Sequence, residues 1–90
     1  MSDGFRWNNW NVEHIGDHGV SPDEAEYVVD HAVPPYPEQI GEGKWRVRGQ
    51  TAEGRYIQVI FLFDPEDTVY IIHARGLEDG EKRQLRRRLG

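Results

Sequence analysis

The sequence predicts one α+β domain, in which a small antiparallel sheet is preceded and followed by helices. Two observations predict this class. Residues 56–63 and 69–72 are rich in β-branched and aromatic side chains, as strands are, and Asp64–Thr68 between them has the composition of a turn. The patterns that cap helices lie outside this apolar hairpin. Ninety residues are enough for one hydrophobic core but not for two, so we expect one domain over residues 1–90.

The N-terminal residues predict a short strand and then a helix. Phe5–Trp7 is compatible with an edge strand of the sheet. We expect the helix over Trp10–His18, with Asn8 or Asn11 as its N-cap. Gly19 stands where a glycine commonly ends a helix.

The second helix has the clearest local signal in the chain. Residues Ser21–Glu24 supply a serine N-cap, a proline at the first helical position and a glutamate that completes a capping box. Apolar residues then recur at helical spacing and form one face: Ala25, Val28, Val29 and Ala32. The Pro34-Pro35 pair ends the helix, and residues 34–43 are expected to form a loop.

The remaining elements predict a three-stranded meander and a third helix. Lys44–Gln50 alternates between apolar and basic residues, which indicates a strand with one buried face. A hairpin loop at residues 50–54 leads into the strand Arg55–Phe63, and the third strand extends from Val69 toward Arg75. The apolar set of the middle strand is expected to pack against the helices: Ile57, Val59, Phe61 and Phe63. A last helix is expected from about Glu78 to Leu89, with Leu85 and Leu89 facing inward and Leu77 nearby. We expect all helices on one face of the sheet.

Composition excludes several classes of protein. A net charge of -5 argues against a protein that coats nucleic acid, although basic residues concentrate in residues 44–90 and acidic ones in residues 1–43. The chain has no cysteine, which excludes disulfides and thiolate zinc sites. It has neither a secretory signal pattern nor an apolar run long enough to cross a bilayer, so a cytoplasmic protein without membrane contact is expected.

Polar residues of the three strands form the first candidate site. Lys44, Arg46 and Arg48 share one side of the first strand, and His73 and Arg75 share one side of the third. Gln58 lies on the side of the middle strand opposite to its apolar set, as do Ile60 and Leu62. Whether these sets meet depends on strand register. If they do, arginines able to bind phosphate stand beside a titratable histidine. By composition alone, an ordinary solvated sheet face is the favoured interpretation.

Histidines suggest a metal site as an alternative. Trp10, His14 and His18 recur every four residues and share one stripe of the first helix, and an i, i+4 histidine pair can chelate a metal. The pattern lacks the glutamate of zinc-protease helices, and His31 is the only further ligand considered, so ordinary helix-end histidines are the favoured interpretation. We predict neither a metal site nor a cofactor.

Several short motifs together resemble the BrnT-like toxin family. They are Trp10–Ile15, Asp17–Glu26 with its His-Gly-Val-Ser turn, Gly49–Tyr56 with its Gly-Arg hairpin, and His73–Leu77 followed by Glu81–Arg83. The resemblance covers nearly the whole chain. It implies a RelE-like fold and the toxin component of a type II toxin–antitoxin system. Such a toxin cleaves RNA without metal by attack of a ribose 2′-hydroxyl on the adjacent phosphate, and a ribbon-helix-helix antitoxin neutralises it.

The resemblance also implies roles for individual residues. Arg75 would stabilise the phosphate, Lys44 stands where an arginine is usual, and His73 replaces a small hydroxyl residue. The expected catalytic residues are His73, Arg75, Lys44 and Glu81. The expected RNA-binding residues are Arg46, Arg48, Gln58, Lys82 and Arg83. The acidic net charge and Gly76, which stands where a polar residue is usual, depart from the family pattern. They keep open an alternative, a non-catalytic protein-interaction module of the same fold, and a homodimer or hetero-oligomer fits either function.

Overall fold

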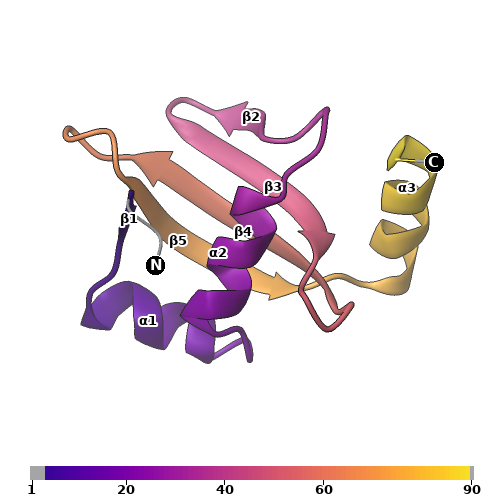
Figure 1. Ribbon diagram of the computed structural model, residues 1–90, viewed down its shortest axis with the longest axis horizontal. Coiled ribbons are helices and arrows are strands. Elements are labelled where there is room, and N and C mark those ends of the chain that lie inside the picture. The colour runs from indigo at the N-terminus through magenta and orange to yellow at the C-terminus, as the bar shows by residue number, and fades with distance from the viewer. Residues whose placement is uncertain (1–3, 90) are drawn as a thin grey trace.

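The computed structural model describes residues 4–89 and has three helices and five strands, which confirms the α+β class (Figure 1). The strands form one mixed sheet in the order β1-β5-β4-β3-β2. In chain order the elements are β1 (Phe5–Arg6), α1 (Asn9–Gly16), α2 (Pro22–Asp30), β2 (Glu38–Gly41), β3 (Lys44–Gln50), β4 (Tyr56–Phe63), β5 (Val69–Gly76) and α3 (Asp79–Leu89). The predicted meander is the β3–β4–β5 centre of this sheet.

A strand flanks the meander on each side, and the sheet is wider than predicted by one of them, β2. β1 occupies the expected edge position, and it pairs parallel with the start of β5, with Phe5 opposite Val69. β2 lies within the segment predicted to be a loop, which is a correction. It pairs with β3 through a tight turn in which Gly43 has φ +72°, and Arg46 binds Glu38 across the pair at 2.6 Å. Because β2 is mostly exposed, it lacks the apolar alternation that identifies a strand.

Side-chain caps determine where the first two helices begin. Asn8 caps α1: its side chain accepts from the Asn11 backbone N–H at 3.1 Å, and the Asn11 amide oxygen accepts from the Asn8 N–H at 2.8 Å. The predicted box at α2 is confirmed, with Ser21 and Glu24 exchanging the same two bonds at 3.2 and 3.0 Å. α1 begins one residue earlier and ends two residues earlier than expected.

The main core lies between the sheet and α1 and α2. Val47, Ile57, Val59 and Ile71 of the sheet are fully buried there, together with Ile15, Ala25 and Val28 of the helices. Phe63 was expected in this core but is 51 % exposed, because it lies at the turn end of β4, opposite Val69. α2 instead covers the other end, where Val28 lies 3.5 Å from the position a Cβ on Gly49 would take.

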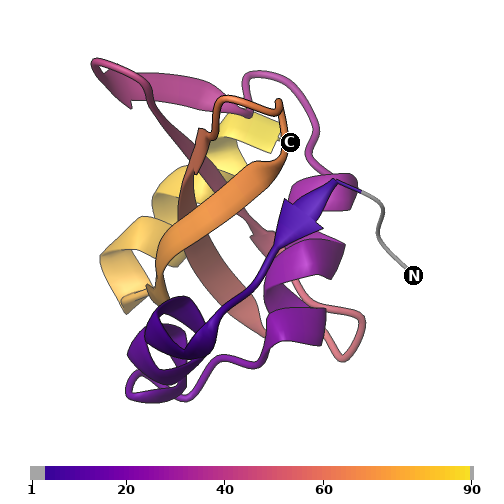
Figure 2. The same cartoon turned by 90° about the vertical axis from the view of Figure 1, so that its left-hand side faces the viewer.

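α3 packs on the other face of the sheet, contrary to the expectation that all helices share one face. Gly49 faces α2, whereas its neighbour Arg48 binds Glu81 of α3. Because neighbouring strand residues point to opposite faces, α2 and α3 lie on opposite sides, as Figure 2 shows. Leu77 and Leu85 are buried as predicted, but Leu89 is 43 % exposed. Between residues 4 and 89, no helix has the length and apolar content needed to span a membrane.

Candidate functional site

Strand register brings the predicted polar residues onto one face of the sheet. Two rows cross β3, β4 and β5: Arg46, Ile60 and His73 in one, and Arg48, Gln58 and Arg75 in the next. We call this the outer face, and it also carries Lys44, Leu62 and Tyr70. α3 covers the end with Arg48 and Arg75. The sequence left open whether the polar residues of the three strands lie on one face. The strand register shows that they do.

A β-bulge in β5 turns His73 toward the outer face. Ile60 pairs with His73 and the next residue, Phe61, pairs with Ile71, so Ile72 is the extra residue. Without the bulge, His73 would share the inward face of Ile71, since residues two apart in a strand point the same way. The bulge therefore places His73 and Arg75 on the outer face while Ile71 and Ala74 remain in the core.

Glu81 joins the two arginines of the covered end. Its carboxylate accepts two hydrogen bonds from Arg75, both at 2.8 Å, and a third from Arg48 at 3.2 Å. The backbone N–H of Glu78 donates to the same carboxylate at 2.9 Å, which fixes it at the start of α3. Arg75 hydrogen-bonding holds the pKa of Glu81 at about 2, and the same pair raises the pKa of Arg75. Glu81 is therefore ionised at neutral pH.

Gln58 lies in the middle of this network rather than in solvent. It is 5 % exposed, and its amide oxygen accepts from Nε of Arg48 at 2.8 Å. The prediction that Gln58 lies on the polar side is confirmed, but the side chain is buried and bonded to Arg48. Its contacts orient Arg48 within the protein.

Three histidines meet at the edge of β5, where α1 packs against the strand. The ring centroids of His18 and His73 lie 5.1 Å apart, and His14 lies 5.9 Å from His73. Trp10 stacks on His14 at 4.8 Å with an interplanar angle of 9°, so the predicted stripe on α1 is confirmed for these two residues. His18 lies in the turn after α1, with its ring 6.1 Å from that of His14. Partial burial lowers the pKa of His73, and positive charge on His18, His14 and Arg75 lowers it further. We call His14, His18 and His73 the histidine cluster.

The other predicted site residues lie farther away. Lys44 is exposed at the opposite end of β3, four residues and about 13 Å from Arg48 at ~3.3 Å per residue. Arg46 is paired with Glu38 of β2, which also binds Arg88 at 3.3 Å. The structure thus brings together His73, Arg75, Arg48, Gln58 and Glu81 but does not bring Lys44 to them.

Two predicted RNA-binding residues follow Glu81 on α3. Lys82 is half-buried, and its Nζ lies 3.9 Å from Asp79. Arg83 is exposed. Both flank the covered end of the outer face, and neither takes part in the Glu81 network.

The third histidine of the metal hypothesis lies elsewhere. His31 follows α2, where its ring stacks on Tyr27 at 3.9 Å and its Nδ1 is 2.8 Å from the Tyr27 carbonyl oxygen. His73 takes the place beside His14 and His18 instead. Within residues 4–89, no group of three or more histidine, cysteine, aspartate or glutamate side chains is arranged to hold a metal ion.

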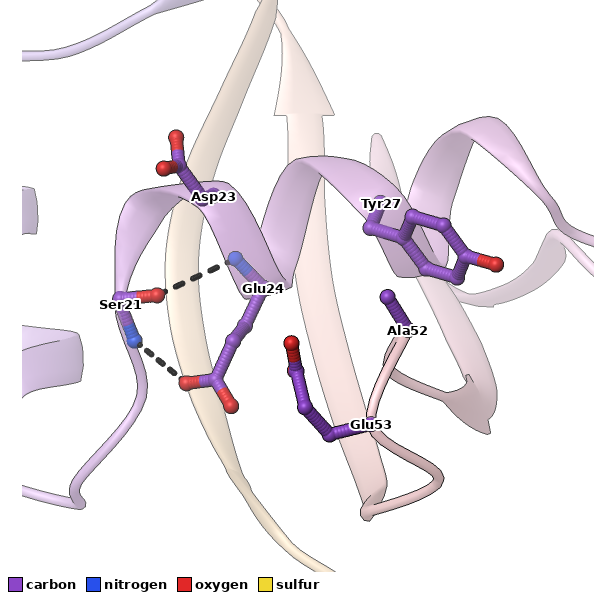
Figure 3. Close-up of a pocket in the computed structure, with 6 residues that line it drawn as sticks. All are labelled: Ser21, Asp23, Glu24, Tyr27, Ala52 and Glu53. Atoms are coloured by element: carbon purple, nitrogen blue, oxygen red, sulfur yellow. Dashed lines mark hydrogen bonds between the residues drawn. The ribbon is translucent and has the colours of Figure 1, made fainter.

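A pocket on the α2 side has a different character. It has a volume of about 430 Å³ and lies between α2 and the β3–β4 loop, as Figure 3 shows. Three carboxylates line it: Asp23, Glu24 and Glu53. Its acidic lining is unsuited to a phosphate, so the basic outer face remains the candidate site.

Sequence reasoning missed the link between α1 and the outer face. The spacing of Trp10, His14 and His18 showed that they share a stripe, but no pattern showed which strand this stripe meets. The parallel pairing of β1 with β5 decides that, because it leads α1 along the edge of β5. The chain matches no protein-family model, and comparisons with curated proteins and with solved structures gave no match.

Proposed function

We propose that this chain is the toxin component of a type II toxin–antitoxin system and that it cleaves RNA. The reaction expected from the resemblance to BrnT-like toxins is metal-independent. A ribose 2′-hydroxyl attacks the adjacent phosphate, and basic side chains stabilise the charge that develops on its oxygens. Acting on cellular RNA, such a protein works in the cytoplasm.

One observation carries the proposal: Arg48, Arg75 and His73 share the outer face. A guanidinium has five N–H donors, and Arg75 uses its Nη atoms on Glu81 and on the Gly76 carbonyl oxygen. Its Nε–H is a further donor for a phosphate oxygen, and a histidine able to transfer protons stands two residues away.

Glu81 fits a positioning role better than a catalytic one. With a pKa of about 2 it holds no proton at neutral pH and cannot act as a general acid. Its carboxylate instead fixes the orientation of two guanidinium groups, which lowers the cost of arranging them around a phosphate. Lys44, at the far end of β3, is better placed to contact a neighbouring phosphate of the RNA than the reacting one.

A partner protein is part of the proposal. The antitoxin expected from the resemblance is a small ribbon-helix-helix protein. Ile60 and Leu62 are half-buried side chains on the outer face, so a bound protein there would cover apolar as well as basic surface. The same observation supports the second candidate function, a non-catalytic interaction module, because an outer face occupied by a protein needs no chemistry.

RNA cleavage by purified protein separates the two functions. Wild type should cleave an unstructured oligoribonucleotide, and Arg75→Ala should lower the rate about 10²–10³-fold, the cost of losing one donor to the transition state. Arg75→Lys keeps the charge but loses the planar fork, so we expect an intermediate rate. Arg87→Ala is the matched control, because Arg87 is exposed on α3 and belongs to no predicted site.

Cells provide a second measurement. Induced expression of wild type should arrest growth and shorten cellular RNAs, whereas Arg75→Ala should do neither. If wild-type protein leaves RNA intact in both settings while it captures a partner, the interaction module replaces the ribonuclease. Thermal unfolding of each variant shows whether a lost activity reflects a lost fold.

A further inference from the structure

The histidine cluster lies where α1 meets β5, next to the end of the outer face that carries Arg75. His18 is exposed, and His14 and His73 are half-buried, so each ring keeps surface that a ligand can reach. Ring centroids separated by 5.1 to 6.1 Å leave little room between the rings, but a group on the solvent side can contact two of them at once. Arg75 is two residues beyond His73 on the same face of β5.

Several independent contacts hold the cluster together. The Asn8–Asn11 capping box fixes the start of α1, and the Asn11 amide group also donates to the Arg6 carbonyl oxygen at 3.1 Å. Ile15 is fully buried in the core on the inward side of α1. Trp10 stacks on both His14 and Tyr70, the latter at 6.3 Å. His14 is therefore positioned by α1 itself. His18 lies in the turn after α1, where its backbone N–H donates to the Ile15 carbonyl oxygen at 3.1 Å.

The positive charges around the cluster disfavour a proton on His73. Within the described residues, no carboxylate forms an ion pair with any of the three rings. The guanidinium group that faces His73 is that of Arg75 on β5. Arg55 lies beside the turn that carries His18, where it donates to the Gly19 carbonyl oxygen at 2.6 Å and is 3.6 Å from Glu24. Partial burial lowers the pKa of His73 and favours its neutral form.

We propose that His73 and His18 are the general base and general acid of RNA cleavage by this chain. The inference rests on the proposed function and adds His18, in the turn after α1, to the catalytic machinery. Neutral His73 takes the proton of the 2′-hydroxyl as the bond from O2′ to phosphorus forms. Protonated His18 gives its proton to O5′ as the bond from phosphorus to O5′ breaks. The products are a 2′,3′-cyclic phosphate and a 5′-hydroxyl, and the two histidines regain their states by exchanging protons with water.

The two roles follow from position. His73 shares its face of β5 with Arg75, so a phosphate bound to Arg75 brings its neighbouring ribose toward His73. His18 belongs to a different element and is the more exposed ring, which allows it to face the leaving group and to be recharged by solvent. His14 lies between Trp10 and both rings and acts as a positioning residue.

The test is single-turnover cleavage of a defined oligoribonucleotide between pH 5 and 9. Wild type should show a bell-shaped profile, in which the acidic limb reports the base and the alkaline limb reports the acid. His18→Gln should slow cleavage about 10²–10⁴-fold and lose the alkaline limb, and His73→Asn should lose the acidic limb. His31→Gln is the matched control, because His31 stacks on Tyr27 outside the cluster and should leave the profile unchanged.

A modified substrate makes the assignment of the acid independent of folding. When sulfur replaces the scissile O5′, the leaving thiolate needs no proton, since a thiol has a pKa near 8.5. His18→Gln should then cleave at nearly the wild-type rate, whereas His73→Asn should stay slow. If folded His18→Gln cleaves the normal substrate at the wild-type rate and keeps the alkaline limb, this inference is wrong. The proposed ribonuclease function is then unaffected. If wild type does not cleave the normal substrate, both this inference and the proposed ribonuclease function are wrong.

Discussion

The two ends of the outer face carry positive charge in different ways. At the α3 end, Arg48 and Arg75 share the carboxylate of Glu81 and stay charged at any ordinary pH. At the α1 end, His14, His18 and His73 contact one another, and Trp10 stacks on His14. Imidazole is the side chain whose charge most readily changes near neutral pH. One end therefore holds fixed charge through hydrogen bonds, and the other holds variable charge through aromatic contacts.

This difference matches two separate tasks of a phosphate-cleaving site. Binding the phosphate requires cations whose charge and direction do not change, which Glu81 ensures by orienting both guanidinium groups. Moving protons requires groups that change charge near neutral pH, which the histidine cluster supplies. Because His73 and Arg75 are two residues apart in β5, a single strand joins the two ends. Single substitutions can therefore disturb one end of the outer face while leaving the other intact.

The largest effect on stability is expected from Glu81→Gln. The substitution removes the charge that Arg48 and Arg75 share at the start of α3. Hydrogen bonds to charged groups contribute about 1.5–3 kcal/mol, so we expect a loss of about 2 kcal/mol in the free energy of unfolding. For a domain of this size, that loss lowers Tm by roughly 8–16 °C. Thermal and urea unfolding measure it.

Asp79→Asn is the matched control for this prediction. Asp79 is on the same turn of α3, but its side chain is 90 % exposed and its partner Lys82 is 3.9 Å away, so a change below about 0.5 kcal/mol is expected. Acid gives an independent check. The folded state lowers the pKa of Glu81 from 4.5 to about 2, so its contribution is present above pH 4.5 and is lost as pH falls through 2. The difference between wild type and Glu81→Gln should shrink over this range, and equal stability of the two at pH 7 contradicts the network.

A smaller loss is expected at the other end from Asn11→Ala. Asn11 is fully buried, completes the capping box of α1 and binds the Arg6 carbonyl oxygen. Loss of a cap and of one buried hydrogen bond should cost about 1–2 kcal/mol. Amide hydrogen exchange should show faster opening in α1 and unchanged protection in β3 and β4.

Asn9→Ala provides the comparison for Asn11→Ala. Asn9 is the exposed first residue of α1 and takes no part in the capping box, so alanine there should leave stability within about 0.5 kcal/mol of wild type. If exchange instead rises equally in α1 and in the central strands, then α1 unfolds only with the whole domain. The two ends would then not be separable.

Local signals in the sequence predicted the elements that close contacts determine. Ser21–Glu24 alone identified the start of α2, because both partners of the capping box lie within one turn. The alternation of Trp45 and Val47 with basic residues identified β3 and its buried face. Leu77 and Leu85 showed that α3 packs against the sheet. They could not show on which side, since a helix after a meander can cross to either face.

The candidate site depends on relations that no local pattern carries. Ile71 and Ile72 are both apolar, so the sequence does not show that Ile72 is the bulge residue that turns His73 outward. The stripe of His14 and His18 was visible, but its contact with His73 follows from the parallel pairing of β1 and β5. Parallel pairing of a two-residue strand leaves no periodicity to detect. Register was therefore the missing information in each case.

The smallest effect, and the most direct measure of the variable end, is the titration of His73. We expect NMR to place its pKa below the ordinary 6.5, because partial burial and the positive charges of His18, His14 and Arg75 disfavour the imidazolium. His18→Gln removes one of these charges and should raise the pKa of His73, whereas the control His31→Gln should not change it. Since the folded state binds this proton more weakly than the unfolded state, the His73 contribution to stability is complete above pH 6.5 and falls as pH drops below it. If the pKa of His73 in wild type is at or above 6.5 and His18→Gln does not change it, then charge on His18 has no electrostatic effect on His73.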